Sequence, residues 1–192
     1  MDVVSTSRSD YGHLLSTLRA IQTDPALTLR LVQPIGPNYQ EYLSRLDAAR
    51  ADGFAPVLQT EMSKQADFLL VLGDRYELLE YVAKAVQSNI VVCHVHGGEE
   101  TEGSFDNRAR HALTKLAHLH FTVHEDYANR VRHLGEESWR IHVVGAPALD
   151  LIAPRPCAGK GVMVCWHPVT LEPALQAFYL SELQAALESL HC

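Results

Sequence analysis

The chain has 192 residues and a formal net charge of −7; 47% of its residues are hydrophobic and 20% are charged. This composition is typical of a globular protein and excludes a disordered chain, which would combine low hydrophobicity with high charge. The acidic balance argues against a broad nucleic-acid-binding surface, and no apolar run approaches the roughly 18–20 residues that span a membrane. The length suits one domain, or one domain with part of a second.

The beginning of the chain and its cysteines indicate a compartment. Residues Met1–Ser5 lack the basic and apolar regions of a signal peptide. The four cysteines form no C-x-x-C pair, and Cys93 and Cys165 lie within apolar runs. We therefore expect these two to be buried thiols in a reducing compartment, and the protein to be cytoplasmic.

Short apolar runs alternate with segments of helical periodicity. The runs typical of buried strands are residues 68–72, 90–93, 121–123, 141–144 and 162–166, with weaker candidates at 3–4 and 29–32. Helical spacing covers residues 14–21, 76–87, 109–118, 127–134 and the region after 175. This alternation predicts an α/β fold with a parallel sheet, whose functional loops follow the strands. No element is predicted between residues 36 and 66, where the pattern is weak.

The domain organisation follows from a segment rich in proline and glycine, residues 145–161. Such a segment is typical of a linker or a crossing between domains. The single strand and helix expected after it cannot form a core alone. We predict an amino-terminal domain over residues 1–150, a linker over 151–161, and a segment 162–192 that either begins a second domain or packs back on the first.

Two loops that follow predicted strands carry candidate charged residues. In residues 6–12, Arg8 lies where backbone amides and a helix dipole favour an anion, and its guanidinium can bind phosphate in two-pronged fashion. A capped helix start with a surface arginine is an equal alternative. In residues 73–75, Gly73 permits a sharp turn and Asp74 is placed as a catalytic carboxylate or a ligand of a sugar hydroxyl. The alternative for Asp74 is a helix N-cap.

A third loop, residues 94–103, combines histidines, glycines and carboxylates. His94 and His96 are two residues apart and would point to the same side if the strand continues through them. The crowding of Glu99, Glu100 and Glu102 favours shifted pKa values. A mobile acidic loop is the plain alternative, and a zinc site formed by both histidines and a carboxylate is another.

Two further segments complete the candidate site. Residues 105–111 open a predicted helix with Asp106 at or near its N-cap, and Arg110 and His111 project from the same end about one turn later. Residues 166–170 follow the last predicted strand and contain His167.

In order and spacing, these segments resemble the hydrolysing UDP-N-acetylglucosamine 2-epimerases of the sialic-acid-pathway branch. The match is strongest between Gly73 and Asp150 and covers most of the chain. Its motifs are Ser7-Arg-Ser-Asp-Tyr-Gly12, Val71-Leu-Gly-Asp-Arg75, the loop 94–101, Arg110-His-Ala-Leu-Thr-Lys-Leu-Ala-His118, Val143-Val-Gly-Ala-Pro147 with Leu149-Asp150, and His167-Pro-Val-Thr-Leu-Glu172.

The resemblance implies the amino-terminal half of a glycosyltransferase-B-like fold, in which two Rossmann-like domains hold a UDP-sugar in the cleft between them. It implies no metal and no nicotinamide cofactor. In the family's reaction UDP is lost across C1–C2 of the sugar, giving a 2-acetamidoglucal, and water then adds with inversion at C2. Proton removal at C2 needs a placed base, and the departing diphosphate needs fixed positive charge.

The resemblance also implies roles for individual residues. The catalytic residues would be Asp74, Asp106 and His167. The substrate-binding residues would be Arg8 at the diphosphate, His96, Glu99 and Arg110. The expected partner is a UDP-sugar, N-acetylglucosamine or a diacetamido relative, with neither nucleic acid nor membrane, and a homo-oligomer is an open alternative.

The chain departs from the family pattern in three places. The family usually has glutamate where this chain has His96, so a carboxylate gives way to an imidazole, for which Glu99 or Glu100 could substitute. Residues 36–39 do not reproduce the usual Gly-x-His, and a complete member would be roughly twice this length. These departures leave three alternatives: a non-catalytic UDP-sugar-binding or regulatory module, a fragment without function, and a metal-dependent hydrolase that uses His94 and His96.

Overall fold

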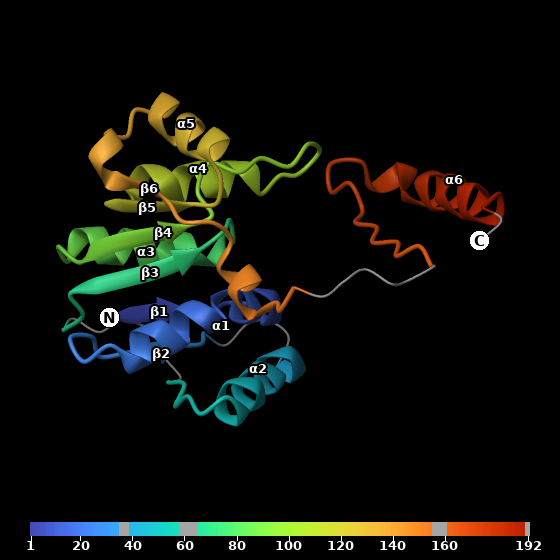
Figure 1. Ribbon diagram of the computed structural model, residues 1–192. Coiled ribbons are helices and arrows are strands. Elements are labelled where there is room, and N and C mark those ends of the chain that lie inside the picture. Colours follow the sequence, from blue (N-terminus) through green and yellow to red (C-terminus); the bar gives the residue numbers. More distant parts are fainter. Residues whose placement is uncertain (35–38, 58–64, 155–160, 191–192) are drawn as a thin grey trace. The chain divides into compact units, whose positions relative to one another are not determined.

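The computed structural model describes residues 1–34, 39–57, 65–154 and 161–190 (Figure 1). The chain divides into two compact units, residues 1–99 with 106–152, and residues 100–105 with 153–192. Most of the predicted linker lies outside the described residues, as do residues 36–38 of the departure at 36–39 and two of the cysteines, Cys157 and Cys192.

The first unit is built on a six-stranded parallel sheet in the order β2-β1-β3-β4-β5-β6, which confirms the predicted fold class (Figure 1). The strands are β1 (Asp2–Val4), β2 (Arg30–Val32), β3 (Phe68–Leu72), β4 (Val91–Val95), β5 (Leu119–Thr122) and β6 (Ile141–Val143). The apolar run at 68–72 coincides with β3, and the other strands lie within one or two residues of the predicted ranges. The register pairs Leu70 with Cys93 and His94 with His120.

Helices cover both faces of this sheet. They are α1 (Arg8–Thr23), α2 (Tyr39–Ala51), α3 (Glu77–Gln87), α4 (Asn107–Leu116) and α5 (Glu125–His133), with short 3₁₀ turns at η1 (Ser138–Arg140) and η2 (Pro147–Leu151). None of the helices among the described residues is long and apolar enough to cross a bilayer.

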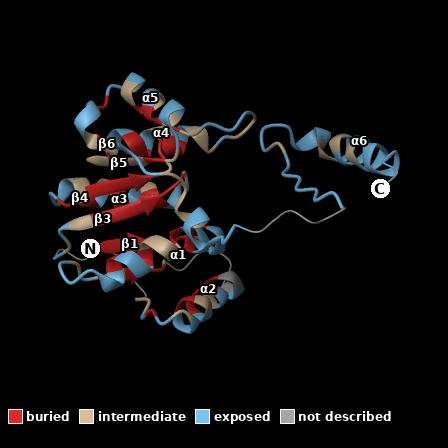
Figure 2. Cartoon of the chain, viewed as in Figure 1, coloured by how far each residue is buried: buried red, intermediate tan, exposed pale blue. Residues whose placement is uncertain are grey.

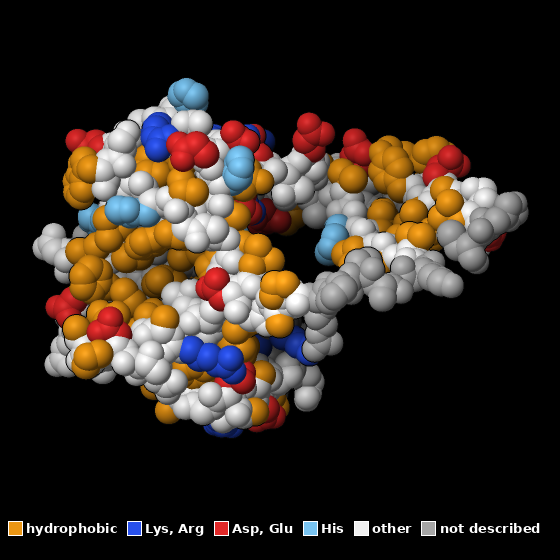
Figure 3. All heavy atoms as spheres, in the orientation of Figure 1, with side chains coloured by type: hydrophobic (Ala, Val, Ile, Leu, Met, Phe, Trp, Pro, Cys, Tyr) orange, Lys and Arg blue, Asp and Glu red, His pale blue; other side chains and the backbone are white. Residues whose placement is uncertain are grey.

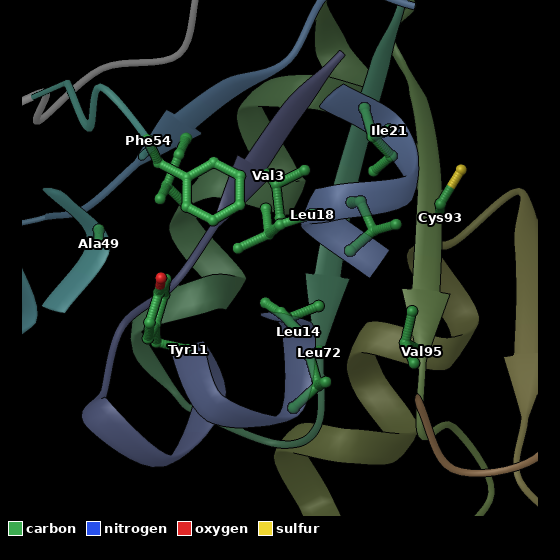
Figure 4. Packing of buried hydrophobic residues seen from close by; sticks show 12 residues of the cluster. Val3, Tyr11, Leu14, Leu18, Ile21, Ala49, Phe54, Leu72, Cys93 and Val95 are labelled. Atoms are coloured by element: carbon green, nitrogen blue, oxygen red, sulfur yellow. The ribbon is translucent and has the colours of Figure 1, made fainter. Parts of the chain in front are cut away.

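Alternation along the buried strands divides the core between the two faces. On one face, apolar residues of α1 pack against β1, β3 and β4, and Figure 4 shows Leu18 near Val3 and Leu14 beside Leu72. On the other face, a second cluster joins α3 and α4 to the alternate strand residues, such as Leu69, Val71 and Val92. The strands are therefore buried on both sides, as Figure 2 shows for β3 and β4.

Helix α2 was not predicted, and its buried stripe explains the omission. Tyr42, Arg45, Leu46 and Ala49 are buried at the i, i+3, i+4, i+7 spacing of a helix. An arginine occupies one position of the stripe, so the segment lacks a continuous apolar pattern. Arg45 is accommodated because its guanidinium donates to the carbonyls of Ser5 at 2.8 Å and Pro34 at 3.1 Å.

The second unit contains a 3₁₀ turn, η3 (Pro173–Leu175), and helix α6 (Gln176–Glu188). The predicted strand at 162–166 is wrong: these residues are irregular, and Val162, Met163 and Trp166 are exposed. A β-strand is stable only when it hydrogen-bonds to a neighbouring strand, and no strand lies among the described residues of this unit. Figure 3 shows hydrophobic side chains on its surface.

The structure separates the two cysteines that lie in apolar runs. Cys93 on β4 is buried and free, as predicted, and burial raises the pKa of its thiol to about 11. Cys165 is exposed, so its predicted burial is wrong. The reason is the missing strand, because the apolar run that surrounds Cys165 has no sheet to enter.

Candidate functional site

The candidate residues of the first unit follow adjacent strands of the sheet. Arg8 comes after β1, Asp74 after β3, and His96 and Glu99 after β4, and these three strands are neighbours. The strand order reverses between β1 and β3, and ligands of open parallel sheets bind at such a point, beyond the carboxyl ends of the strands. The predicted gathering of these loops at one edge of the sheet is therefore observed.

Most of residues 6–12 belong to helix α1, so the structure confirms the capped helix start, which was one of the two alternatives for this segment. Ser7 is the N-cap of α1 and accepts a hydrogen bond from the amide of Asp10 at 3.1 Å. The Asp10 carboxylate in turn accepts from the Ser7 amide at 2.9 Å and from the Thr6 hydroxyl at 2.6 Å, which completes a capping box. Arg8 is the first helical residue and is exposed, and its side chain forms no hydrogen bond or ion pair within the described residues.

Asp74 lies directly after a glycine turn at the end of β3. Gly73 has φ +80°, and its amide donates to the carbonyl of Val95 at 2.9 Å, which ties the turn to β4. The Asp74 carboxylate pairs with the guanidinium of Arg110 on α4. The N-cap interpretation of Asp74 is wrong, because α3 begins later, with Tyr76 at its N-cap.

Arg110 connects two loops. Its side chain is only 9% exposed, and besides Asp74 it pairs with Glu99, with Nη1 3.0 Å from Oε2. The carboxylate of Glu99 also lies 2.7 Å from Nδ1 of His96. Burial raises the pKa of the Glu99 carboxyl, but the hydrogen bond from His96 and the positive charge of Arg110 outweigh it, so the pKa lies below its ordinary value. Asp74, Arg110, Glu99 and His96 thus form one connected polar network, in which Glu99 is ionised near neutral pH.

The two histidines of the loop have different environments. β4 ends at Val95, and His96 has φ +64°, so the strand does not continue through it. His94 is fully buried, with Nε2 2.8 Å from the carbonyl oxygen of Gly73 and Nδ1 3.2 Å from the hydroxyl of Thr114. Burial lowers the pKa of His94 to about 4. Both nitrogens of His94 are occupied, which argues against the zinc alternative, and no cluster of three or more metal-binding side chains occurs in the described part of the chain.

Two glycines allow the loop to approach its neighbours closely. A Cβ on Gly97 would come within 3.0 Å of Nδ1 of His94. Gly98 has φ +81°, and a Cβ there would lie 2.3 Å from the carbonyl oxygen of Tyr127 on α5. The carbonyl of Gly98 accepts a hydrogen bond from Arg130, also on α5. Glu99 is therefore held by a loop that is fixed on α5.

The two remaining catalytic candidates lie in different units. Asp106 is the N-cap residue of α4, as predicted, and its carbonyl accepts from the amide of Arg110 at 3.0 Å. His167 belongs to the second unit, is exposed, and has Nε2 3.4 Å from Sγ of Cys165.

Sequence reasoning did not identify two residues near the network. The ring of His13 on α1 lies 6.0 Å from the ring of His96, measured between centroids. Thr114 on α4 contacts His94. Helical periodicity predicted which residues of α1 face the core. It could not predict that His13 of the same helix would lie near His96, the residue that follows β4. Thr114 had a weak signal, since it lies one turn after Arg110.

Comparison with known proteins adds evidence of ancestry. A family model described as UDP-N-acetylglucosamine 2-epimerase matches residues 18–182, which is most of the chain. The chain belongs to this family. It is 28% identical over 223 residues to the UDP-N-acetylglucosamine 2-epimerase of Neisseria meningitidis serogroup B, covering 96% of this chain and 58% of that protein. It is 35% identical over 150 residues to the hydrolysing UDP-N,N'-diacetylbacillosamine 2-epimerase of Legionella pneumophila, covering 70% of this chain and 39% of that protein.

Solved structures of the family share the fold. The Neisseria meningitidis UDP-GlcNAc 2-epimerase bound to UDP-GlcNAc superposes with a TM-score of 0.66 at 17% identity, covering 78% of this chain and 48% of that chain. An epimerase from Methanocaldococcus jannaschii, in complex with UDP-GlcNAc and UDP, has a TM-score of 0.65 at 16% identity. The expected Rossmann-like amino-terminal half of a glycosyltransferase-B-like fold is thus confirmed. The chain spans about half the length of the relatives it matches.

Proposed function

We propose that this chain supplies the amino-terminal half of the site of a hydrolysing UDP-sugar 2-epimerase. The substrate would be UDP-N-acetylglucosamine or a diacetamido relative, and the products UDP and an N-acetylmannosamine-type sugar. The observation that carries the proposal is the network of Asp74, Arg110, Glu99 and His96 at the carboxyl ends of β3 and β4, in a chain of this family. Relatives bound to UDP-GlcNAc and to UDP support a nucleotide-sugar ligand.

The chemistry of the reaction fits the residue types at this edge of the sheet. Loss of UDP across C1–C2 needs a base near C2 and fixed positive charge at the departing diphosphate. Arg8, exposed at the start of α1, would provide that charge together with the positive end of the helix dipole. Arg110 is already neutralised by two carboxylates, so its role would be to position Asp74 and Glu99.

The remaining assignments rest on the family resemblance. Asp106 at the start of α4 and His167 of the second unit would be catalytic. Glu99 and His96 would contact the sugar.

Turnover in heavy water tests this function. The chain is incubated with UDP-N-acetylglucosamine, and in a parallel reaction with the UDP-linked diacetamido sugar, and UDP release and deuterium at C2 of the product are measured. Release of UDP with deuterium at C2 is the expected result. Absence of UDP release with both substrates would contradict the proposed function.

A non-catalytic UDP-sugar-binding module is the second candidate. It is favoured by position 96, where this chain has an imidazole and the family usually has a carboxylate. Calorimetry separates the two candidates, because binding of UDP without turnover supports the module and absence of binding contradicts both.

A further inference from the structure

The imidazole of His96 is held at one nitrogen and open at the other. Nδ1 lies 2.7 Å from Oε1 of Glu99. Nε2 is buried and has no hydrogen-bond partner among the described residues. A buried polar atom without a partner costs free energy and is found in native proteins chiefly where a ligand, a water molecule or a catalytic task accounts for it. The His96 side chain keeps 15% of its surface exposed, so it is not sealed in the core.

The backbone of His96 is also unusual. Its φ of +64° lies in the left-handed region, which non-glycine residues rarely adopt and which occurs preferentially at functional sites. The conformation is fixed from both sides: the His96 amide donates to the carbonyl of Phe121 at 3.0 Å, and Gly97 follows directly. The strained backbone therefore directs the ring away from the strand and toward Glu99.

Glu99 determines which nitrogen of His96 carries the proton. The Glu99 carboxylate accepts from Arg110 at 3.0 Å and is ionised near neutral pH. An ionised carboxylate only accepts hydrogen bonds, so Nδ1 of His96 carries the hydrogen and the lone pair of neutral imidazole lies on Nε2. A carboxylate behind a histidine orients the ring and stabilises the imidazolium that forms when the ring takes up a proton.

We propose that His96, oriented by Glu99, is the base that removes the proton from C2 of the UDP-sugar in this chain. The assignment rests on the proposed function and replaces the substrate-binding role that the resemblance implied for His96. In the step, the C2–H bond breaks and its proton goes to Nε2, while its electron pair forms the C1=C2 bond. The C1–O bond breaks at the same time and its pair leaves with UDP. The imidazolium then returns its proton to solvent. An imidazole–carboxylate pair thus does the work of a single carboxylate.

Charged and titratable groups near His96 come from several elements. Glu99 of the same loop pairs with the ring, His13 of α1 lies 6.0 Å from it between ring centroids, and His94 of β4 interacts with it electrostatically. Arg110 of α4 and, through it, Asp74 after β3 are linked to His96 by Glu99.

Two substitutions at position 96 test the assignment. His96→Asn removes Nε2, tolerates the left-handed backbone, and places an amide N–H where Nδ1–H contacts Glu99. UDP release and deuterium incorporation at C2 should fall by about 100-fold or more. His96→Glu restores a carboxylate that can act as a base at this position, so it should recover part of the rate that His96→Asn loses. His133→Gln on the exposed end of α5 is the control and should leave the rate unchanged.

The outcomes separate this assignment from the proposed function. Turnover by the wild-type chain that survives His96→Asn, or a His96→Glu variant no faster than His96→Asn, overturns the assignment and leaves the function intact. A wild-type chain that releases no UDP overturns both. Thermal unfolding of each variant identifies a loss of folding, and in that case nitrogen NMR of the wild-type ring decides: a hydrogen on Nδ1, and an Nε2 signal that shifts with UDP-N-acetylglucosamine, support the assignment, and a hydrogen on Nε2 overturns it.

Discussion

Arg110 on α4 forms an ion pair with Asp74, the residue that follows the glycine turn at the end of β3. The same guanidinium holds Glu99 at 3.0 Å, so one buried cation fixes carboxylates from two loops. Removing the cation would leave two carboxylates close together without compensation, and breaking a buried pair is costly even where its formation adds little net stability.

We therefore expect Arg110→Met to destabilise the fold by about 1–3 kcal/mol, the lower end of the range for buried pairs, because Asp74 and Glu99 are each 24% exposed. Arg108→Met, on the exposed side of the same helix, is the matched control and should change the free energy of unfolding by less than about 0.5 kcal/mol. Urea denaturation measures both variants. Equal midpoints for the two would contradict a structural role for the network.

Replacing each of two glycines by alanine should change the stability of the fold in opposite directions. At Gly98 a Cβ would lie 2.3 Å from the carbonyl oxygen of Tyr127 and the backbone has φ +81°, so Gly98→Ala should cost about 2 kcal/mol or more. Gly12 lies within α1 with open space around it, and Gly12→Ala should stabilise the helix by about 0.5–1 kcal/mol. Melting temperatures that move in the same direction would count against this geometry.

His94 should make the fold sensitive to acid. Burial lowers its pKa to about 4, while the unfolded imidazole titrates near about 6.5. Between these values the unfolded chain binds the additional proton, so stability is present above about pH 6.5 and is lost as the pH falls toward 4. Burial also lowers the pKa of His120, which adds an effect of the same sign. The slope is at most about 1.4 kcal/mol per pH unit for each histidine.

Denaturation at a series of pH values measures that slope, and His94→Gln should make it shallower. Proton NMR gives a direct check, because the ring resonance of His94 should keep its neutral position down to about pH 5. A His94 resonance that titrates near pH 6.5 would show that the ring is not buried as described.

Arg8 separates binding from folding. It is exposed and has no ion-pair partner within the described chain, so Arg8→Ala should leave the melting temperature unchanged. If the diphosphate binds at the start of α1, the same change should weaken UDP binding by about tenfold or more, because a charge-assisted hydrogen bond is lost. Arg50→Ala on α2 is the control, and calorimetry with UDP measures both. Equal UDP affinities for the two variants would show that the diphosphate does not contact Arg8.

The sequence predicted the sheet well where strands are covered on both faces. The run at 68–72 is apolar throughout, and a strand buried on both sides requires that pattern. Helix α2 was missed because Arg45 occupies its buried stripe, and the hydrogen bonds to Ser5 and Pro34 that make the burial tolerable are tertiary contacts. The strand expected at 162–166 does not form, although the run is apolar, because an apolar run becomes a strand only beside a partner strand.

For the candidate site, topology was predictable and side-chain pairing was not. The carboxyl ends of adjacent parallel strands had to bring residues 74 and 94–99 to one edge of the sheet. The left-handed turn at His96 was not predictable, and it ends the alternation of β4 at Val95 and lets the ring pair with Glu99. No pattern of spacing indicated that Asp74 would pair with Arg110 instead of capping α3.

Because Gly98 is attached to α5, the position of the Glu99 carboxylate depends on α5 as well as on its own loop. Gly98 packs closely against the backbone oxygen of Tyr127, and its carbonyl accepts a hydrogen bond from the Arg130 side chain. Any substitution that tilts or slides α5 would carry the loop with it, and the carboxylate of Glu99 would shift relative to His96. Substitutions at the buried positions of α5, such as Ala128 and Val131, should therefore alter the geometry of the His96–Glu99 pair although neither residue contacts that pair.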